Sequence, residues 1–245
     1  MDVQYHFNGD LVLQVNLGGP LTIETNRRML QFAETVASAN IPGIQSIIPA
    51  MTSFSIKYEP RKVGITELIS HLQQLQRHIG ESPSIASKRV VVPVAFSEKY
   101  GLDIPYIQEK TGLGVEEMVE RMTRKPFHVY MLGFIAGLPY MGEIDPELRL
   151  PRRATPRIEV AKGSIAIANE LTNIYTESSP GGWHVIGWTP MATFDIDAAI
   201  PTIVQAGDEV LFKEISTSEA EQWDTNKQRE WDETWNPSLL KSQDF

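Results

Sequence analysis

The chain has 245 residues, of which 42% are hydrophobic and 22% charged, so it carries enough apolar material for one large or two small globular domains. Its net charge of −9 argues against nucleic acid and anionic membrane as main partners, because both are polyanions. The absence of cysteine excludes disulfides, a thiolate nucleophile and cysteine metal sites.

The first 95 residues alternate between strand-like and helix-like periods. The pattern predicts four strands and two helices, with strands at 11–15, 44–48, 53–58 and 90–94 and helices at 26–39 and 66–79. This β-α-β-β-α-β order is that of a ferredoxin-like α+β unit. We therefore expect an N-terminal α+β domain over residues 1–88, although the strand at 90–94 equally suits the start of a second domain.

Two short helices are predicted within residues 103–123, and the sequence pattern changes after them. From His128 to Phe212, short β-like runs are punctuated by Gly and Pro, at 129–132, 165–167, 185–188 and 210–212. Many short strands with frequent turns indicate a closed or sandwich-like β structure, which we assign to a second domain over residues 89–215.

The last segment, residues 216–245, is acidic and holds Trp223, Trp231 and Trp235. Their spacing favours an aromatic stripe on a helix. We expect this stripe to fold back on its own core rather than to contact a partner. No apolar run approaches the ~20 residues of a membrane helix, and the N-terminus lacks signal-peptide features, so a cytoplasmic protein that does not bind membrane is expected.

Most standard catalytic motifs are missing. The sequence has no P-loop, no Gly-x-Gly-x-x-Gly after a strand, no His-Glu-x-x-His and no Gly-x-Ser-x-Gly. The five histidines are scattered without metal-ligand spacing, so no metal site is predicted. If ATP takes part in the function, this chain does not bind it in the P-loop manner.

The segment 149–157, Arg-Leu-Pro-Arg-Arg-Ala-Thr-Pro-Arg, holds four arginines within nine residues of an acidic protein. Its prolines disfavour a helix and restrain the backbone. Rigidly held guanidinium groups suit the recognition of carboxylate or phosphate. The alternative is a solvated loop with local ion pairs to Asp145, Glu147 or Glu159.

Two further segments are candidates for a site. In Ser178–His184, the paired glycines Gly181 and Gly182 allow backbone amides to approach an anion, Trp183 offers a stacking surface, and His184 offers a group that titrates near neutral pH. A hairpin turn followed by a core tryptophan is the alternative. The apolar, glycine-rich segment 133–142 either lines a pocket or caps a barrel.

These segments, in this order, resemble the family of the 5-oxoprolinase B subunit, also known as the sporulation kinase A inhibitor and as allophanate hydrolase subunit 1. The resemblance covers about residues 5–215, and its most specific motifs are Gly133-Phe134 through Tyr140, Pro151–Arg157, and Pro180–Trp183. It implies an N-terminal α+β domain and a cyclophilin-like β-barrel. It also implies partners, the A and C subunits of 5-oxoprolinase, and ATP-dependent cleavage of 5-oxoproline to glutamate.

The resemblance further implies roles for individual residues. Arg152, Arg153 and Arg157 are expected to surround a transferring phosphoryl group or to hold the substrate carboxylate. A catalytic role for His184 is expected from its own chemistry, as a group that can move a proton near neutral pH, and not from the resemblance. Substrate or nucleotide binding is expected of Tyr140, Tyr175, Gly181, Gly182 and Trp183.

The chain departs from the family pattern at several positions. Met122 stands where a histidine is usual, Leu171 and His184 replace glutamines, and further differences are Ala136, Leu138, Asn173 and Thr176. These departures favour an altered substrate or a regulatory role. The regulatory alternative is a protein that binds and inhibits a sensor histidine kinase through its N-terminal domain and tail. Prolyl isomerisation is disfavoured, because a shared fold does not transfer activity.

Overall fold

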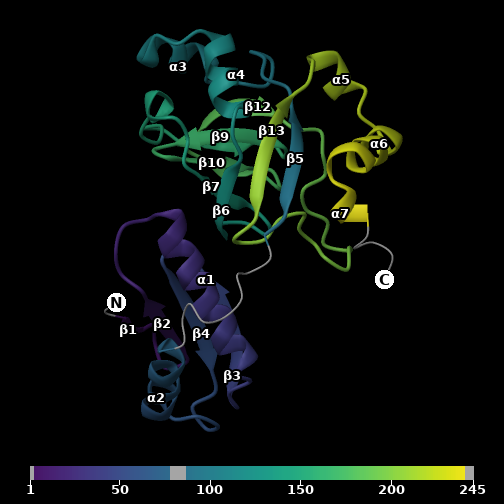
Figure 1. Cartoon of the computed structure of the whole chain (residues 1–245). Helices are drawn as coiled ribbons and strands as arrows, with labels where there is room; N and C mark the ends of the chain where they lie inside the picture. The colour runs from purple at the N-terminus through teal and green to yellow at the C-terminus, as the bar shows by residue number, and fades with distance from the viewer. Residues whose placement is uncertain (1–2, 78–86, 241–245) are drawn as a thin grey trace. The chain divides into compact units, whose positions relative to one another are not determined.

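The computed structural model describes residues 3–77 and 87–240, and the chain divides into two compact units, residues 1–86 and 87–245 (Figure 1). The first unit has a four-stranded antiparallel sheet in the order β1-β2-β4-β3. Its elements are β1 (Gln4–Phe7), β2 (Val12–Asn16), α1 (Ile23–Ser38), β3 (Ile44–Pro49), β4 (Ser53–Tyr58) and α2 (Ile65–Gln76).

Alternation along the two central strands builds the core of the first unit. Leu13 and Val15 of β2 lie opposite Ile56 and Phe54 of β4, and all four side chains are fully buried. Helix α1 covers this face, and its Phe32 contacts the Phe54 ring edge-on at a centroid distance of 5.3 Å. The helix therefore packs where the strand pattern places the apolar side chains.

The ferredoxin-like assignment of this unit is not confirmed. The strand expected to close its sheet, β5 (Arg89–Val94), instead pairs in parallel with β13 (Glu209–Glu214) of the second unit. The alternative, that this strand opens the second domain, is confirmed. The edge position beside β2 is occupied by β1, which the sequence did not predict because its four residues are largely exposed and lack a clear apolar pattern.

The second unit is built on a seven-stranded sheet in the order β12-β9-β10-β7-β6-β13-β5. Its two edges meet where Ala95, after β5, exchanges two backbone hydrogen bonds of 2.8 and 3.1 Å with Trp188 of β12, so the sheet forms a nearly closed barrel. The strands not yet given are β6 (Phe127–Leu132), β7 (Pro139–Gly142), β9 (Ser164–Ala168), β10 (Leu171–Ile174) and β12 (His184–Trp188).

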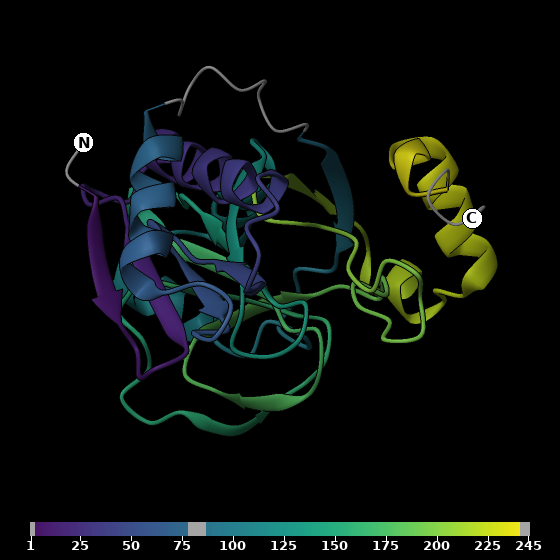
Figure 2. The same cartoon turned by 90° about the horizontal axis from the view of Figure 1, so that it is seen from below.

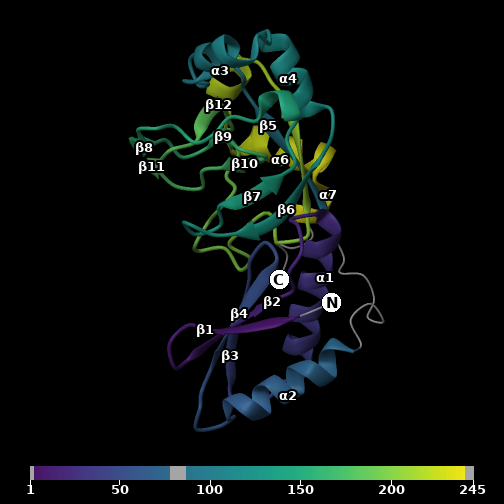
Figure 3. The same ribbon diagram turned by 90° about the vertical axis from the view of Figure 1, so that its left-hand side faces the viewer.

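Additional elements surround the barrel. Two short helices, α3 (Ile104–Thr111) and α4 (Val115–Thr123), precede β6 as predicted. A 3₁₀ turn, η1 (Pro146–Leu148), follows β7. A separate two-stranded ribbon, β8 (Arg157–Val160) with β11 (Ser179–Gly181), extends away from the barrel (Figure 3).

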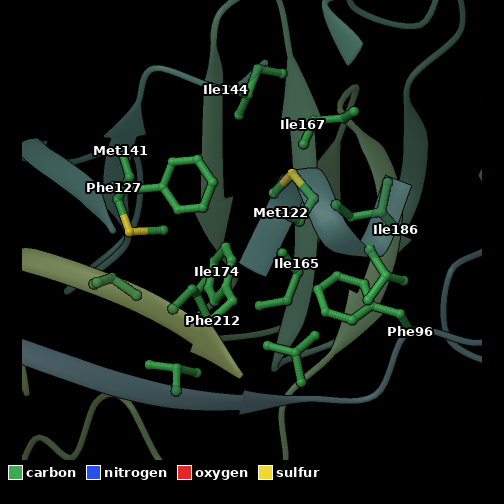
Figure 4. Close-up of a cluster of buried hydrophobic side chains, with 14 of the residues drawn as sticks. Phe96, Met122, Phe127, Met141, Ile144, Ile165, Ile167, Ile174, Ile186 and Phe212 are labelled. Atoms are coloured by element: carbon green, nitrogen blue, oxygen red, sulfur yellow. The ribbon is translucent and has the colours of Figure 1, made fainter. Parts of the chain in front are cut away.

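The barrel interior is a packed apolar core (Figure 4). Met122 of α4 is fully buried among the inward side chains of the strands, as are Ile165 and Ile167 of β9. Other members of the cluster are Phe127, Met141, Ile144, Ile174, Ile186 and Phe212. Because these side chains fill the interior, a ligand site has to be sought on the outer surface of the barrel.

The C-terminal segment forms the helices α5 (Thr217–Glu221), α6 (Thr225–Trp235) and α7 (Pro237–Leu240) (Figure 2, yellow). Its side-chain contacts show that it folds back on its own unit, as predicted. Trp231 contacts Trp223 and Trp235 at centroid distances of 5.6 and 6.0 Å, and its Nε1 donates to the Val91 carbonyl of β5 at 2.9 Å. None of the helices in the described residues combines the length and apolar composition that crossing a bilayer requires.

Candidate functional site

A pocket of about 220 Å³ lies between the outer face of the barrel and the β8–β11 ribbon. It is lined by Phe134, Tyr140, Arg152, Pro156, Asn173, Tyr175, Pro180, Gly181, Gly182 and Trp183. The pocket thus brings together all three segments that the sequence singled out. Of the predicted site residues, the two tyrosines, the two glycines, Trp183 and Arg152 line it, whereas Arg153, Arg157 and His184 do not.

The alternation of β7 and β10 places two lining side chains on the outer face of the barrel. Met141 and Ile174 point into the barrel core, so their neighbours Tyr140 and Asn173 point outward. Tyr140 and Asn173 are also partners in the strand ladder, so their side chains lie side by side in the pocket wall.

The close approach of the ribbon to the barrel requires a glycine at position 181. A Cβ atom there would lie 2.2 Å from the Tyr175 hydroxyl oxygen, far inside contact distance. The arginine segment is tied to the same ribbon, because the Arg153 amide donates to the Gly182 carbonyl at 2.8 Å. A side chain is therefore sterically excluded at Gly181, whereas Gly182 has room for a Cβ, with its nearest neighbour atom at 3.6 Å.

Aromatic rings and one cation form the walls of the pocket. The Tyr140 and Trp183 rings meet edge to face at 5.6 Å and 78°, and the Arg152 guanidinium lies 5.8 Å from the Trp183 ring centroid. Arg152 is exposed and, among the described residues, has no carboxylate within ion-pair distance. This guanidinium is thus available to an anionic ligand.

Burial raises the pKa of both pocket tyrosines above the ordinary value. For Tyr140 the nearby Arg152 charge opposes the shift, and for Tyr175 a hydrogen bond with Asn173 opposes it. Both phenols therefore stay protonated at neutral pH and offer hydroxyl groups, rather than phenolates, to a ligand.

The other two predicted arginines are held by a residue that sequence reasoning missed, Asp103. Its carboxylate is 2% exposed and accepts hydrogen bonds from Arg153 Nη1, from both terminal nitrogens of Arg157 at 2.7 and 2.9 Å, and from the Val185 amide at 2.7 Å. Burial by itself would raise the pKa of Asp103, but these hydrogen bonds and positive charges outweigh it and lower the pKa.

Asp103 thereby anchors the arginine segment to the start of α3 and to β12. Two of the three local partners that the sequence suggested are engaged elsewhere, since Asp145 binds Arg124 and Glu147 binds Arg121, and no ion pair of the third, Glu159, is present in the described structure. Because Asp103 is 50 residues away from Arg153 in sequence, no local pattern could reveal the pairing.

His184 is buried outside the pocket lining. Its ring stacks on Tyr106 at 5.1 Å and an interplanar angle of 9°, and its Nε2 donates to the Pro151 carbonyl at 2.9 Å. In this position it holds the start of the arginine segment against β12. Across the described ranges, no three His, Asp or Glu side chains are grouped closely enough to hold a metal ion.

Sequence reasoning also missed the pocket roles of Phe134 and Asn173. Phe134 is 66% exposed and has a φ of +71°, so the chain presents this ring at the rim of the pocket. Asn173 is 3% exposed, and its Oδ1 has no hydrogen-bond partner among the described residues. A signal for Phe134 was available, because it lies within a singled-out motif. Asn173 was noted only as a departure from the family pattern, and its place in the pocket depends on the folded barrel.

Comparison with known proteins places this architecture in a family. Residues 3–204 match the family model described as "Carboxyltransferase domain, subdomain C and D". The 5-oxoprolinase B subunit of Bacillus subtilis is 30% identical over 88% of this chain and 95% of its own length. The protein of the same name from Haemophilus influenzae is 34% identical over 80% of this chain and 91% of its own length.

Solved structures agree with this comparison. The structure titled TTHA0988 has a TM-score of 0.74 at 32% identity and covers 84% of this chain, which spans 40% of that longer protein. The Kluyveromyces lactis urea amidolyase has a TM-score of 0.75 at 18% identity and covers 98% of this chain, which spans 18% of it, so it supports the fold alone. The chain belongs to the carboxyltransferase domain family, subdomain C and D, together with the B subunits of 5-oxoprolinase.

Proposed function

We propose that the chain is one subunit of an ATP-dependent amide-hydrolysing complex, that the substrate is 5-oxoproline, and that the pocket beside the β8–β11 ribbon holds it. The names of the relatives support a role in such a complex. The observation that carries the assignment of the pocket is Arg152, an arginine without an acidic partner among the described residues, beside an aromatic wall. A carboxylate on a small ring suits this combination.

The chemistry explains why ATP and further subunits are needed. A lactam is a poor electrophile, and transfer of a phosphoryl group from ATP to its carbonyl oxygen releases ADP and activates the carbon. Water then adds to that carbon and the ring C–N bond breaks, which frees the amino group and leaves a γ-glutamyl phosphate. A second water displaces the phosphate from this acyl phosphate and gives glutamate. This chain contributes binding and orientation of the ring.

ATP itself is assigned to a partner, either the A or the C subunit of the complex. The sequence has no P-loop, and the pocket of about 220 Å³ is below the ~300–1,000 Å³ of typical sites for drug-sized ligands. A nucleoside triphosphate would extend out of such a pocket, whereas a single five-membered ring fits within it.

The test is glutamate release from 5-oxoproline and ATP by this chain co-purified with the A and C subunits. We expect release to require this chain, and we expect Arg152→Ala to lower kcat/KM by about 10- to 100-fold, as for loss of a charged hydrogen bond. Arg149→Ala is the matched control, since Arg149 lies in the same segment, pairs with Glu143 and is outside the pocket lining.

Two results would contradict the proposal. If glutamate were still released when this chain is omitted, the chain would not be required for the reaction. An Arg152→Ala variant as active as the Arg149→Ala control would show that the substrate does not bind in this pocket. Arg152→Lys is expected to retain part of the activity, because it keeps the charge and loses the planar fork.

A further inference from the structure

The side chain of Asn173 is placed in the pocket with one of its polar atoms unused. It belongs to β10, is 3% exposed and lines the pocket, and its Oδ1 has no hydrogen-bond partner among the described residues. The Asn173 side chain also interacts with the neighbouring Tyr175, and this interaction lowers the pKa of the Tyr175 phenol against the effect of burial. The carbonyl oxygen is therefore the acceptor left for a ligand.

An unpaired buried acceptor is unusual enough to need an explanation. Leaving such a group without a partner is unfavourable, and the large majority of buried side-chain polar atoms are paired. The backbones of Asn173 and its ladder partner Tyr140 are committed to the sheet, so they offer no spare donor to the side chain. A donor from a bound ligand would satisfy Asn173 Oδ1.

The rest of the pocket limits what that ligand is. Arg152 supplies positive charge near the Trp183 ring, and the Tyr140 and Trp183 rings supply apolar walls at a steep angle to each other. The ligand therefore combines a flat or slightly puckered apolar body, an anionic group and an N–H donor. The volume of about 220 Å³ suits a small molecule.

We propose that the pocket selects a small cyclic secondary amide that bears a carboxylate, with the ring N–H donated to Asn173 Oδ1 and the carboxylate held by Arg152. Asn173 then determines specificity, because its Oδ1 accepts a hydrogen bond that only a ligand with a ring N–H can donate. This inference rests on the proposed function, since it describes how the same pocket recognises its substrate.

The test compares two ligands that differ at one ring position. Binding of 5-oxoproline and of its lactone analogue, in which a ring oxygen replaces N–H, is measured calorimetrically on the full chain. We expect the lactam to bind at least about fivefold more tightly than the lactone, because the lactone leaves Asn173 Oδ1 unpaired and turns a ring oxygen toward it.

Variants of one strand supply the matched controls. In Asn173→Leu and Asn173→Gly the lactam-to-lactone ratio is expected to fall to about one. In Thr172→Val the ratio should stay at the wild-type value, because Thr172 is the adjacent residue and its hydroxyl bonds the Ala166 carbonyl instead. Circular dichroism melting curves identify any variant that has lost the fold.

Each outcome bears on either the inference or the proposed function. Equal binding of the two ligands by the wild type, or a ratio that survives in both Asn173 variants, would overturn the inference. Absence of lactam binding by a folded full chain would overturn it as well. If the ratio behaves as expected but the complete complex releases no glutamate, the inference stands and the proposed catalytic function fails.

Discussion

At the scale of single residues, Asp103 holds the arginine segment in place. Its single carboxylate pairs with two guanidinium groups whose side chains are 30% and 21% exposed. We expect Asp103→Asn to lower the free energy of unfolding by roughly 2–3 kcal/mol, below the ~3–5 kcal/mol of a fully buried pair because solvent still reaches the arginines. Urea unfolding measures the loss. Glu209→Gln breaks the exposed pair with Arg89 and should cost less than about 1 kcal/mol.

The same carboxylate makes the stability of the protein depend on pH. The pKa of Asp103 is lowered in the folded state, so its contribution is present above the unfolded pKa of about 3.9 and is lost as pH falls through the folded value. Below about pH 4 the wild type should therefore lose stability more steeply than Asp103→Asn. If the free energy of unfolding fell equally with pH in the two proteins, Asp103 would not be the group responsible for the loss of stability.

The pocket shows which site residues a sequence can reveal. Tyr140, Arg152 and Trp183 lie in short segments rich in Gly, Pro or Arg, and such local patterns can be recognised in a single sequence. Asp103 and Asn173 could not be found in this way. Asp103 acts across about 50 residues of sequence, and Asn173 is defined by which face of β10 it occupies, which depends on the folded barrel.

At the scale of elements, the tail completes an edge of the barrel. One edge of β5 pairs with β13, and on its other edge the Asn236 side chain imitates a neighbouring strand. Its Oδ1 accepts from the Val91 amide at 2.7 Å and its Nδ2 donates to the Val91 carbonyl at 3.0 Å. The tail thereby covers an otherwise unpaired strand edge, of the kind that promotes aggregation.

We predict that Asn236→Ala lowers the free energy of unfolding by about 1–3 kcal/mol, because the buried Val91 amide then has no partner. Hydrogen exchange of the β5 amides should accelerate in this variant. Ser238→Ala is a suitable control from α7, since no hydrogen bond of its side chain is present in the described structure. A change confined to the tail, with the Val91 amide still protected, would contradict this role.

The elements also show where sequence patterns are informative. Helices and strands with a clear period, such as α1 and β4, were predicted within a few residues of their observed bounds. The strands β7, β8, β10 and β11 were not predicted. They have three or four residues each, and β10 is buried on both faces, so no alternation distinguishes it from a loop.

At the scale of the whole molecule, the proposed site lies within one of the two compact units. Every residue that lines the pocket, and Asp103 with both of its arginines, belongs to residues 87–245. The core that supports the pocket is drawn from the same range. A site built wholly within one unit should not depend on the other unit for its geometry.

We therefore predict that a fragment of residues 87–245 folds and binds 5-oxoproline within about twofold of the full chain, as expected for independent parts of a protein. Its lactam-to-lactone ratio should match the full chain, and Asn173→Leu should abolish that ratio in both. Calorimetry on the fragment, after a melting curve has shown a cooperative transition, provides the measurement. A folded fragment with much weaker binding would show that residues 1–86 contribute to the site. The barrel pocket alone would then not account for the affinity of the full chain for 5-oxoproline.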